Sequence, residues 1–320
     1  MTALEMFSVS AIIPVYRGRE TIARAVDSIN QQSVRPIEII VVDNEPDLEL
    51  ETFLPSSDCP ISVLREPRLG AAFARNAGMA AARGTHYAFL DCDDEWTAEY
   101  LSAMSRAIRS NPWSSLFAGA SLVYTDDGGR YERPPRFGKH ALSRLLVYNG
   151  IATSGVVVNG AAARSCGGFL EGLSVPAGCE DWALWLNLLR HGEGVAVPDA
   201  IVTRHESLAN ARRVGSQAFY RDLQMAARHG LGEHPSRRLV RAADAGIALR
   251  RGTEHLSQGN RREALICTSR ALLRYPLSRY GWAWFALALA PRSLGRGARR
   301  LRLSIEAIRR YWHRKPHEKR

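Results

Sequence analysis

Cysteines are few in this 320-residue chain, and none of the five lies in a C-x-x-C motif. Zinc sites and disulfide frameworks depend on such spacings, so the sequence predicts neither, and we expect a reduced, cytosolic setting. Long hydrophobic runs are also lacking. The longest, residues 281–290, is about half the length of a membrane span, and the N-terminal residues have no basic region like that of a signal peptide.

Charge is distributed unevenly along the chain. From Leu208 to the end there are 25 Lys and Arg residues against 7 Asp and Glu residues, a balance of +18. The preceding 207 residues contain 18 basic and 25 acidic residues, a balance of −7. An acidic body followed by a basic tail indicates two regions with different partners.

Strand and helix patterns alternate in the first 95 residues. We expect strands at residues 9–15, 37–42, 61–64 and 87–90, and helices at residues 20–31 and 71–82. This alternation predicts an α/β fold with a Rossmann-like, mostly parallel sheet flanked by helices. Ligands of such sheets bind beyond the carboxyl ends of the strands.

The rest of the chain divides into a continued α/β part and an all-α extension. The expected elements are a polar loop at residues 126–139, strands at 156–158 and 195–201, and a helix at 181–189. Strand signals end near residue 214, and residues 245–276 resemble one tetratricopeptide-like hairpin, which needs a partner surface. The predicted domains are 1–213, with halves 1–95 and 96–213, and a basic helical region, 214–320.

Carboxylates are clustered where the strand at residues 87–90 ends, in the sequence Asp91-Cys92-Asp93-Asp94. Clustered carboxylates repel one another unless a cation or a ligand rich in donors joins them. Mn²⁺ or Mg²⁺, which bridges carboxylates and substrate phosphates, suits such oxygen ligands. The alternative is a solvated turn or a helix N-cap at Asp94.

Two further groups of polar residues lie far away in the sequence. Glu180 and Asp181 begin a predicted helix, where acids either stabilise the helix dipole or take a proton from an attacking hydroxyl. Asp43 and Asn44 end the second strand, where they can hydrogen-bond a ribose or a base. Each group alone indicates little, but their order along the chain is informative.

This order and spacing resemble the family 2 glycosyltransferases, which have the GT-A fold, over residues 9–207. The matching segments are VSAIIPVY at 9–16, SINQQ at 28–32, EIIVVD at 38–43, Gly70 with ARNAG at 74–78, FLDCDD at 89–94, GGF at 167–169 and EDW at 180–182. The resemblance implies an inverting, metal-dependent enzyme that moves a sugar from a nucleotide diphosphate to a hydroxyl. The acceptor would be a saccharide or lipid-linked, in synthesis of cell-surface polysaccharide or glycolipid.

The resemblance also implies a role for each site residue. The residues implied to bind the nucleotide are Pro14, Val15 and Tyr16 around the base and Asp43 or Asn44 at the base and ribose. Arg75 would lie near the donor, and Asp91 would lie on its ribose side. Asp93 would bind the Mn²⁺ or Mg²⁺, and His205 would touch the diphosphate or metal unless it is an ordinary surface residue. Asp181 would be the general base, supported by Glu180.

Two positions depart from the family pattern. Asn44 stands where many relatives have Asp, which leaves thymidine or guanine nucleotides open beside uridine. Leu170 replaces the usual Asp after the Gly-Gly-Phe element, so the acceptor side is not carried over.

Two alternative functions fit the sequence less well than sugar transfer does. A sugar-nucleotide pyrophosphorylase needs a glycine-rich, basic loop after the first strand, and residues 16–19 are too short for it. A non-catalytic nucleotide-sugar-binding module would not need both Asp93 and Asp181.

The basic tail begins with the aromatic segment at residues 280–285 and continues with seven arginines between 292 and 310. Aromatic residues beside an arginine-rich helix fit the surface of an anionic membrane. A helical cap with a solvated arginine face is the alternative, and nucleic acid is not expected without a recognition motif. Peripheral attachment to the inner membrane face is therefore the hypothesis for the tail.

Overall fold

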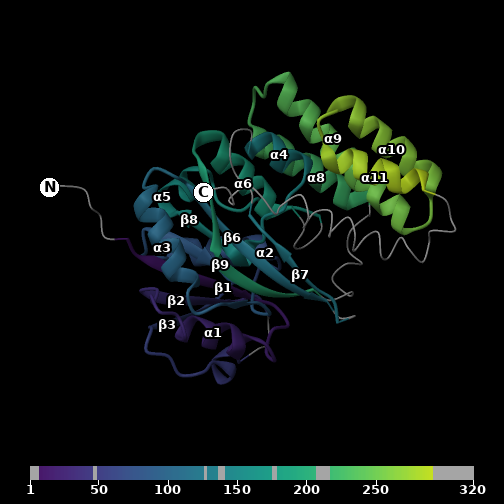
Figure 1. Cartoon of the computed structure of the whole chain (residues 1–320). Helices are drawn as coiled ribbons and strands as arrows, with labels where there is room; N and C mark the ends of the chain where they lie inside the picture. The colour runs from purple at the N-terminus through teal and green to yellow at the C-terminus, as the bar shows by residue number, and fades with distance from the viewer. Residues whose placement is uncertain are drawn as a thin grey trace, which may run out of the picture. The chain divides into compact units, whose positions relative to one another are not determined.

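The computed structural model describes residues 7–45, 49–125, 128–135, 141–174, 179–206 and 217–290. Its elements are β1 (Val9–Val15), α1 (Ile22–Asn30), β2 (Glu38–Asp43), η1 (Leu50–Phe53), β3 (Ile61–Arg65), α2 (Ala71–Ala81), β4 (His86–Phe89), β5 (Glu95–Trp96), α3 (Tyr100–Ser110), β6 (Leu116–Thr125), β7 (Arg130–Arg133), α4 (Ala141–Val147), η2 (Thr153–Gly155), β8 (Val156–Asn159), α5 (Gly160–Ser165), α6 (Glu180–His191), β9 (Gly194–Glu206), α8 (Gln217–Leu231), α9 (Arg237–Ser257), α10 (Arg261–Arg274) and α11 (Arg279–Leu289). The chain divides into two compact units, Met1–Pro235 and Ser236–Arg320 (Figure 1).

One sheet runs through the first unit in the order β3-β2-β1-β4-β8-β6-β9-β5, with β7 paired to β6. From β3 to β4 every pairing is parallel, as the alternating sequence pattern predicts. Beyond β4 the sheet is mixed: β8 is antiparallel to both β4 and β6, and β6 is parallel to β9. The predicted α/β fold with a helical extension is confirmed, and the part of the sheet in which every pairing is parallel is built from the N-terminal strands β1 to β4.

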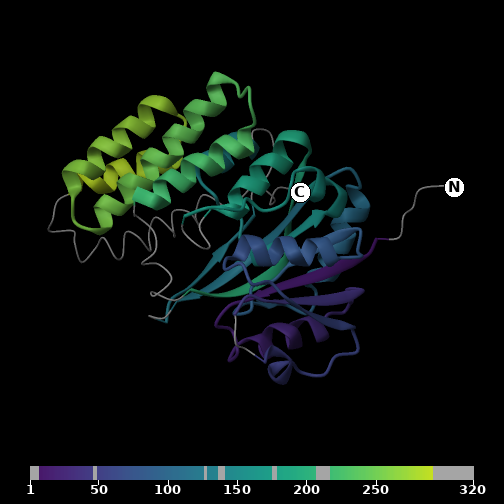
Figure 2. The ribbon, with the colours of Figure 1, turned by 180° about the vertical axis from the view of Figure 1, so that it is seen from behind.

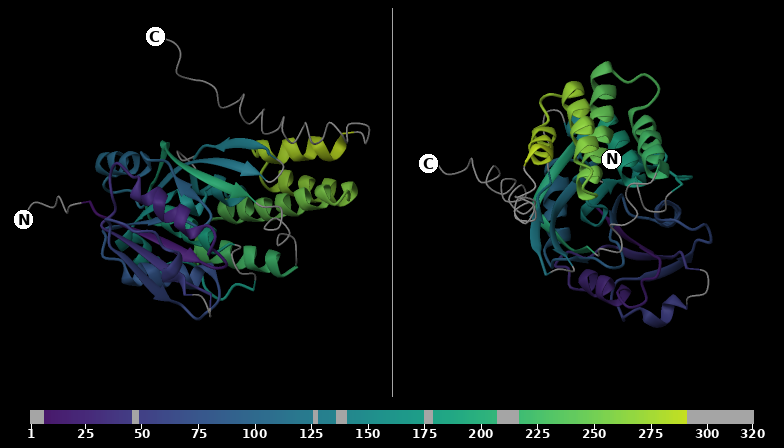
Figure 3. Two further views of the ribbon diagram at one scale, coloured as in Figure 1. Left: turned by 90° about the horizontal axis from the view of Figure 1, so that it is seen from below. Right: turned by 90° about the vertical axis from the view of Figure 1, so that its right-hand side faces the viewer.

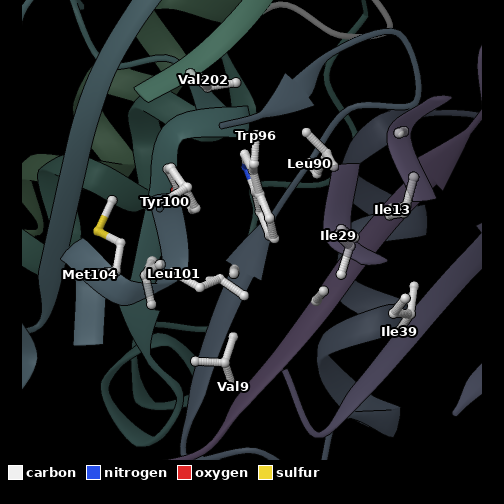
Figure 4. Packing of buried hydrophobic residues seen from close by; sticks show 14 of the residues in the cluster. Val9, Ile13, Ile29, Ile39, Leu90, Trp96, Tyr100, Leu101, Met104 and Val202 are labelled. Atoms are coloured by element: carbon white, nitrogen blue, oxygen red, sulfur yellow. The ribbon is translucent and has the colours of Figure 1, made fainter. Parts of the chain in front are cut away.

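Side chains of the strands alternate between two layers of helices, because successive residues of a strand point to opposite faces. On β1, Val9 and Ile13 face a buried cluster that includes Ile29 of α1 and Tyr100 and Met104 of α3. Figure 4 shows this cluster from close by. Helices α1 and α3 thus cover one face of the sheet (Figures 1 and 2).

The opposite face is covered by α2, which comes unusually close to the strands. A Cβ atom at Gly78 would lie 2.5 Å from Ile12 Cγ2, so only glycine allows this approach. Ala74, one turn earlier, packs against Val42 and Ile40 of β2. This close packing holds the beginning of α2 at the carboxyl edge of the parallel strands.

Two parts of the first unit differ from the expectation. Residues 126–139 were expected to form a loop, but Arg130–Arg133 form β7, whose backbone pairs with β6. The sequence predicts residues 217–231 as part of the C-terminal region, but they form helix α8, which belongs to the first unit and packs on α6. A Cβ atom at Gly230 of α8 would lie 2.5 Å from Leu186 Cβ.

The described part of the second unit contains three helices that pack on one another, α9, α10 and α11 (Figures 1 and 3). Helices α9 and α10 form the predicted hairpin, and α11 supplies a packing surface that one hairpin needs. The arginines from 292 onward lie outside the described residues. Over the described residues, no helix is both long enough and apolar enough to cross a membrane.

Candidate functional site

Strand β4 ends in the acidic loop, directly beside η2. Phe89 pairs with Val156 in the antiparallel register of β4 and β8, and the backbone N–H of Asp91 donates to Ser154 Oγ at 3.1 Å. No helix begins at Asp94, so the helix N-cap interpretation of that residue is wrong. The Asp94 carboxylate instead accepts a hydrogen bond from Ser154 Oγ at 2.5 Å.

Arg75 of α2 links the two acidic segments that the sequence separates by almost ninety residues. One guanidinium nitrogen lies 2.6 Å from Asp91 Oδ1, and another lies 3.0 Å from Glu180 Oε1. Arg75 is 5% exposed, which makes these charge-assisted contacts strong. The arginine predicted to lie near the donor therefore fixes both acidic segments.

The neighbouring Asn76 explains why two of the quoted motifs occur together. Its side-chain amide donates to Phe169 O at 2.9 Å, and its carbonyl oxygen accepts from Phe169 N at 2.8 Å. The Phe169 ring lies under the Arg75 guanidinium, with 5.3 Å between Cζ and the ring centroid. The Gly-Gly-Phe element is thus a support for Arg75.

Asp181 is the second residue of α6, and both of its carboxylate oxygens are held. Thr153 Oγ1 donates to Oδ2 at 3.1 Å, and the backbone N–H of Trp182 donates to Oδ1 at 2.5 Å. Burial raises the pKa of Asp181 to about 6, and the negative charge of Glu180 acts in the same direction against the lowering effect of Arg75. A carboxylate with this pKa can accept a proton near neutral pH.

Asp91 and Asp93 have opposite pKa shifts. Burial is the largest influence and would raise the pKa of Asp91, but the charge and hydrogen bond of Arg75, together with Arg204 and Ser154, bring the pKa below its ordinary value. The pKa of Asp93 is raised, first by burial and then by the charge of Asp91. Asp93 therefore lies in a position where an added cation would stabilise its ionised form.

The carboxylate oxygens of the acidic loop are of the kind that suits a divalent cation. Asp91 and Asp93 carry hard carboxylate oxygens, and no side chain of the described residues donates a hydrogen bond to the Asp93 carboxylate. No group of three or more possible ligands occurs among the described residues. A cation here would need oxygen atoms from the diphosphate to complete its shell, as Mg²⁺ sites often do.

His205 has partners of its own near the end of β9. Its Nε2 lies 3.2 Å from Glu95 Oε1, and its ring stacks on Tyr124 with 5.8 Å between centroids. Arg24 also pairs with Glu95, at 3.0 Å. Contact between His205 and a metal or diphosphate stays a prediction.

The first two strands present few side chains for a nucleotide. Tyr16 is 39% exposed, with the Arg17 guanidinium 5.2 Å from its ring centroid. Pro14 is half-buried. Val15 is fully buried in the core, and its carbonyl accepts from Asn44 N at 2.9 Å, which supports a packing role.

Asp43 and Asn44 are both buried, and both side chains have partners within the protein. Asp43 Oδ1 accepts from Glu45 N at 3.0 Å, and Oδ2 lies 3.3 Å from the exposed Arg65. Asn44 is buried, and its amide shapes the loop before α2 by donating to the carbonyls of Glu66 and Arg68 and accepting from Gly70 N. Its two N–H donors are thus used within the protein.

Cys92, between the two acidic residues, is a packing residue. A Cβ atom at Gly18 would lie 2.5 Å from its sulfur, so the loop after β1 and the acidic loop touch. Burial raises the pKa of the Cys92 thiol to about 12, which leaves it protonated.

Sequence reasoning did not identify Thr153, Ser154 and Arg204 as site residues. Arg204 Nε lies 3.4 Å from Asp94 Oδ2, and its position next to His205 was a signal. Thr153 and Ser154 lie in no recognisable motif. Only the pairing of β4 with β8 brings them to the acidic loop.

Comparison with known proteins finds glycosyltransferases. The family model described as Glycosyl transferase family 2 matches residues 10–163. The Escherichia coli protein named UDP-Glc:alpha-D-GlcNAc-diphosphoundecaprenol beta-1,3-glucosyltransferase WfaP is 30% identical over 191 residues, 58% of this chain and 71% of that protein. WfgD of the same species, with the same description, is 29% identical over 58% of this chain and 72% of its own length.

Solved structures share the fold at low sequence identity. TarS residues 1–349 of S. aureus, in complex with UDP-GlcNAc, has a TM-score of 0.61 and 15% identity, covering 88% of this chain and 89% of that one. GalNAc-T7 with UDP, GalNAc and Mn²⁺ has a TM-score of 0.57 and 16% identity, covering 87% of this chain and 58% of that one.

Proposed function

The chain belongs to glycosyltransferase family 2, and on this premise we propose that it transfers a hexose from a UDP-sugar to a lipid-linked saccharide with inversion at the anomeric carbon. The names of the E. coli relatives support both the uridine nucleotide and the diphosphoundecaprenol acceptor. They also support a place in cell-surface polysaccharide synthesis. The pyrophosphorylase alternative is set aside by the family.

The double ion pair of Arg75 is the observation that carries this proposal. By holding Asp91 and Glu180 at 2.6 and 3.0 Å, it keeps the donor-side acids and the start of α6 in one site. Transfer by a single displacement needs that arrangement, because the donor and the base that activates the acceptor must lie on opposite sides of the anomeric carbon.

The side chains divide the work of such a displacement. Tyr16 and Asp43 would contact the nucleotide, and Asp91 stays ionised beside Arg75 to bind the ribose side of the donor. Asp181 would take the proton of the acceptor hydroxyl, and Glu180 keeps Arg75 in place.

Asp93, with Asp91 nearby and His205 as a second candidate, would hold Mn²⁺ or Mg²⁺. When bound, the cation supplies positive charge that stabilises the leaving diphosphate. Mn²⁺ in the GalNAc-T7 structure supports this part of the proposal by analogy of fold.

The second unit supports attachment to an anionic membrane surface, where a lipid-linked acceptor would be found. Five large apolar side chains of its described part are exposed: Leu273 by 84%, Leu277 by 78%, Leu289 by 60%, Trp282 by 55% and Val240 by 40%. Trp282 and Leu289 are seven residues apart, so they share one face of α11. The arginines Arg274 and Arg279 lie beside them in sequence and are exposed.

Product analysis tests the proposed function. The full chain would be incubated with UDP-glucose, Mn²⁺ and a lipid-linked N-acetylglucosamine diphosphate, and the product would be examined by mass spectrometry and NMR. We expect one added hexose in the β configuration from the α-linked donor. A product with retained configuration, or hydrolysis of the donor without any transfer to this or other lipid-linked saccharides, would contradict the proposal.

A further inference from the structure

Six residues of the site form a closed ring of contacts. Asp91 pairs with Arg75, and Arg75 pairs with Glu180. The peptide bond leads from Glu180 to Asp181, whose Oδ2 accepts from Thr153 Oγ1 at 3.1 Å. From Thr153 the next peptide bond leads to Ser154, whose Oγ accepts from Asp91 N at 3.1 Å and closes the ring. Arg75 forms one side of this ring, and the turn η2 forms the other.

The strand register explains why η2 reaches both acidic segments. Phe89 of β4 is paired with Val156 of β8. Because the two strands are antiparallel, the position two residues after Phe89 lies opposite the position two residues before Val156, so Asp91 lies opposite Ser154. Thr153 is the first residue of the 3₁₀ turn η2, and its side chain reaches Asp181 in the first turn of α6.

Ser154 fixes the acidic loop at three points. It is fully buried, its hydroxyl donates to Asp94 Oδ2 and accepts from Asp91 N, and its carbonyl accepts from Trp96 Nε1 at 2.7 Å. A single buried residue therefore sets the path of residues 91–96. Its hydroxyl has both its donor and an acceptor position in use, so alanine leaves buried partners unsatisfied.

Thr153 acts on the other segment. Its hydroxyl hydrogen bond keeps Asp181 Oδ2 in one orientation, and it lowers the pKa of that carboxyl against burial and the charge of Glu180. The charged groups that act on Asp181 are Glu180, which raises the pKa, and Arg75, which lowers it. Of the side chains that affect the pKa of Asp181, Thr153 is the uncharged one, so it can be replaced without changing the charge of the site.

We propose that Thr153 and Ser154 are positioning residues: together they hold the proton acceptor Asp181 in a fixed orientation to the donor-binding loop at Asp91. The proposal rests on the function proposed above, because it takes Asp181 to be the base. It assigns the two residues different effects: Thr153 contacts the base and should affect kcat, whereas Ser154 contacts the donor-binding loop and should affect the Kd of UDP.

The test compares Thr153→Val, Thr153→Ser and Ser154→Ala in the full chain. Thr153→Val keeps the shape but removes the hydroxyl, and we expect kcat to fall by about tenfold, the size of one hydrogen bond to a charged group. The acid limb of kcat should move to higher pH, while the Kd of UDP in Mn²⁺ stays within about twofold, because the barrier and not nucleotide binding is altered. Thr153→Ser should restore both kcat and the limb.

Ser154→Ala should show the converse pattern, with a UDP Kd raised by about tenfold and the acid limb unmoved. Turnover is expressed per UDP-binding site from calorimetry, so partial unfolding does not mimic the effect. If Thr153→Val folds too poorly, Thr153→Ala replaces it with the same expectation. The positioning proposal is wrong if Asp181→Asn is inactive while Thr153→Val, or Thr153→Ala in its place, keeps the kcat and pH limb of the unaltered protein. An active Asp181→Asn would instead overturn the proposed function.

Discussion

The carboxylates of Asp91 and Asp181 belong to the same ring of contacts, but their pKa values are shifted in opposite directions. Asp91 has a guanidinium nitrogen at 2.6 Å and a lowered pKa. Asp181 lies within ion-pair distance of no basic side chain among the described residues, and its pKa is raised to about 6. Arg75 uses its two contacts on Asp91 and Glu180, which leaves Asp181 able to take a proton.

Among the substitutions considered, removal of Arg75 should have the largest effect, because it abolishes the ion pair that distinguishes Asp91 from Asp181. Arg75→Met keeps much of the side-chain length but leaves Asp91 and Glu180 without their cation, and loss of one partner of a buried ion pair costs about 3–5 kcal/mol. Urea denaturation measures the free energy of unfolding. Arg35→Met is the matched control, because its pair with Asp58 is exposed and worth under about 1 kcal/mol. Equal losses in the two variants would contradict the assigned role of Arg75.

Asp181→Asn should keep the shape of the base but abolish its proton affinity. We expect kcat to fall by about 10²–10⁴-fold, typical of a lost proton acceptor, with the Kd of UDP nearly unchanged. The control is Asp58→Asn, at an exposed acid in the same unit. Near-full transfer by Asp181→Asn would show that another group accepts the proton.

Asp93→Ala should remove the response of UDP binding to metal. In the unaltered protein Mn²⁺ should tighten UDP binding, because Asp93 would hold the cation and the cation would supply positive charge to the diphosphate. Calorimetry with and without Mn²⁺ should show this gain lost in Asp93→Ala and reduced by a smaller factor in His205→Ala, whose ring already lies against Glu95. A larger loss in His205→Ala would reverse the assignment of the main ligand.

The smallest effect is expected in the second unit. Changing Leu277 and Trp282 together to Glu should weaken sedimentation with phosphatidylglycerol vesicles several-fold, because an exposed apolar and basic surface becomes acidic. Hydrolysis of UDP-glucose in solution should not change. Binding that is equal in the two proteins, or absent from the unaltered protein at low salt, would favour a helical cap over a membrane surface.

The N-terminal half of the fold was predictable because its signals are local. Buried parallel strands such as β1 and β2 are continuous apolar runs, and their ends show directly where polar residues gather. The quoted motifs likewise assign Arg75, Asp91 and Asp181 to one site, and the structure brings the three into one ring of contacts. What they could not indicate was the pairing, because Arg75 has several acids within reach of its helix.

The second half was less predictable, for reasons visible in its strands. Small residues at Gly119 and Ala120, where the β6–β9 register shifts, interrupt the apolar pattern of β6. Strand β7 is polar and exists because its backbone pairs with β6. Thr153 and Ser154 gain their importance from antiparallel pairing across the sheet, which leaves no local pattern.

The pH dependence of kcat at saturating donor tests most directly whether Asp181 is the proton acceptor that Arg75 leaves unpaired. The base must be ionised to act, and its pKa is raised to about 6, so kcat should be full above that pH and fall as the pH decreases through about 6. Glu180→Gln removes a neighbouring negative charge and should move the limb to lower pH. A limb near the ordinary pKa of an exposed aspartate, about 4, or one that Glu180→Gln leaves in place, would contradict the account.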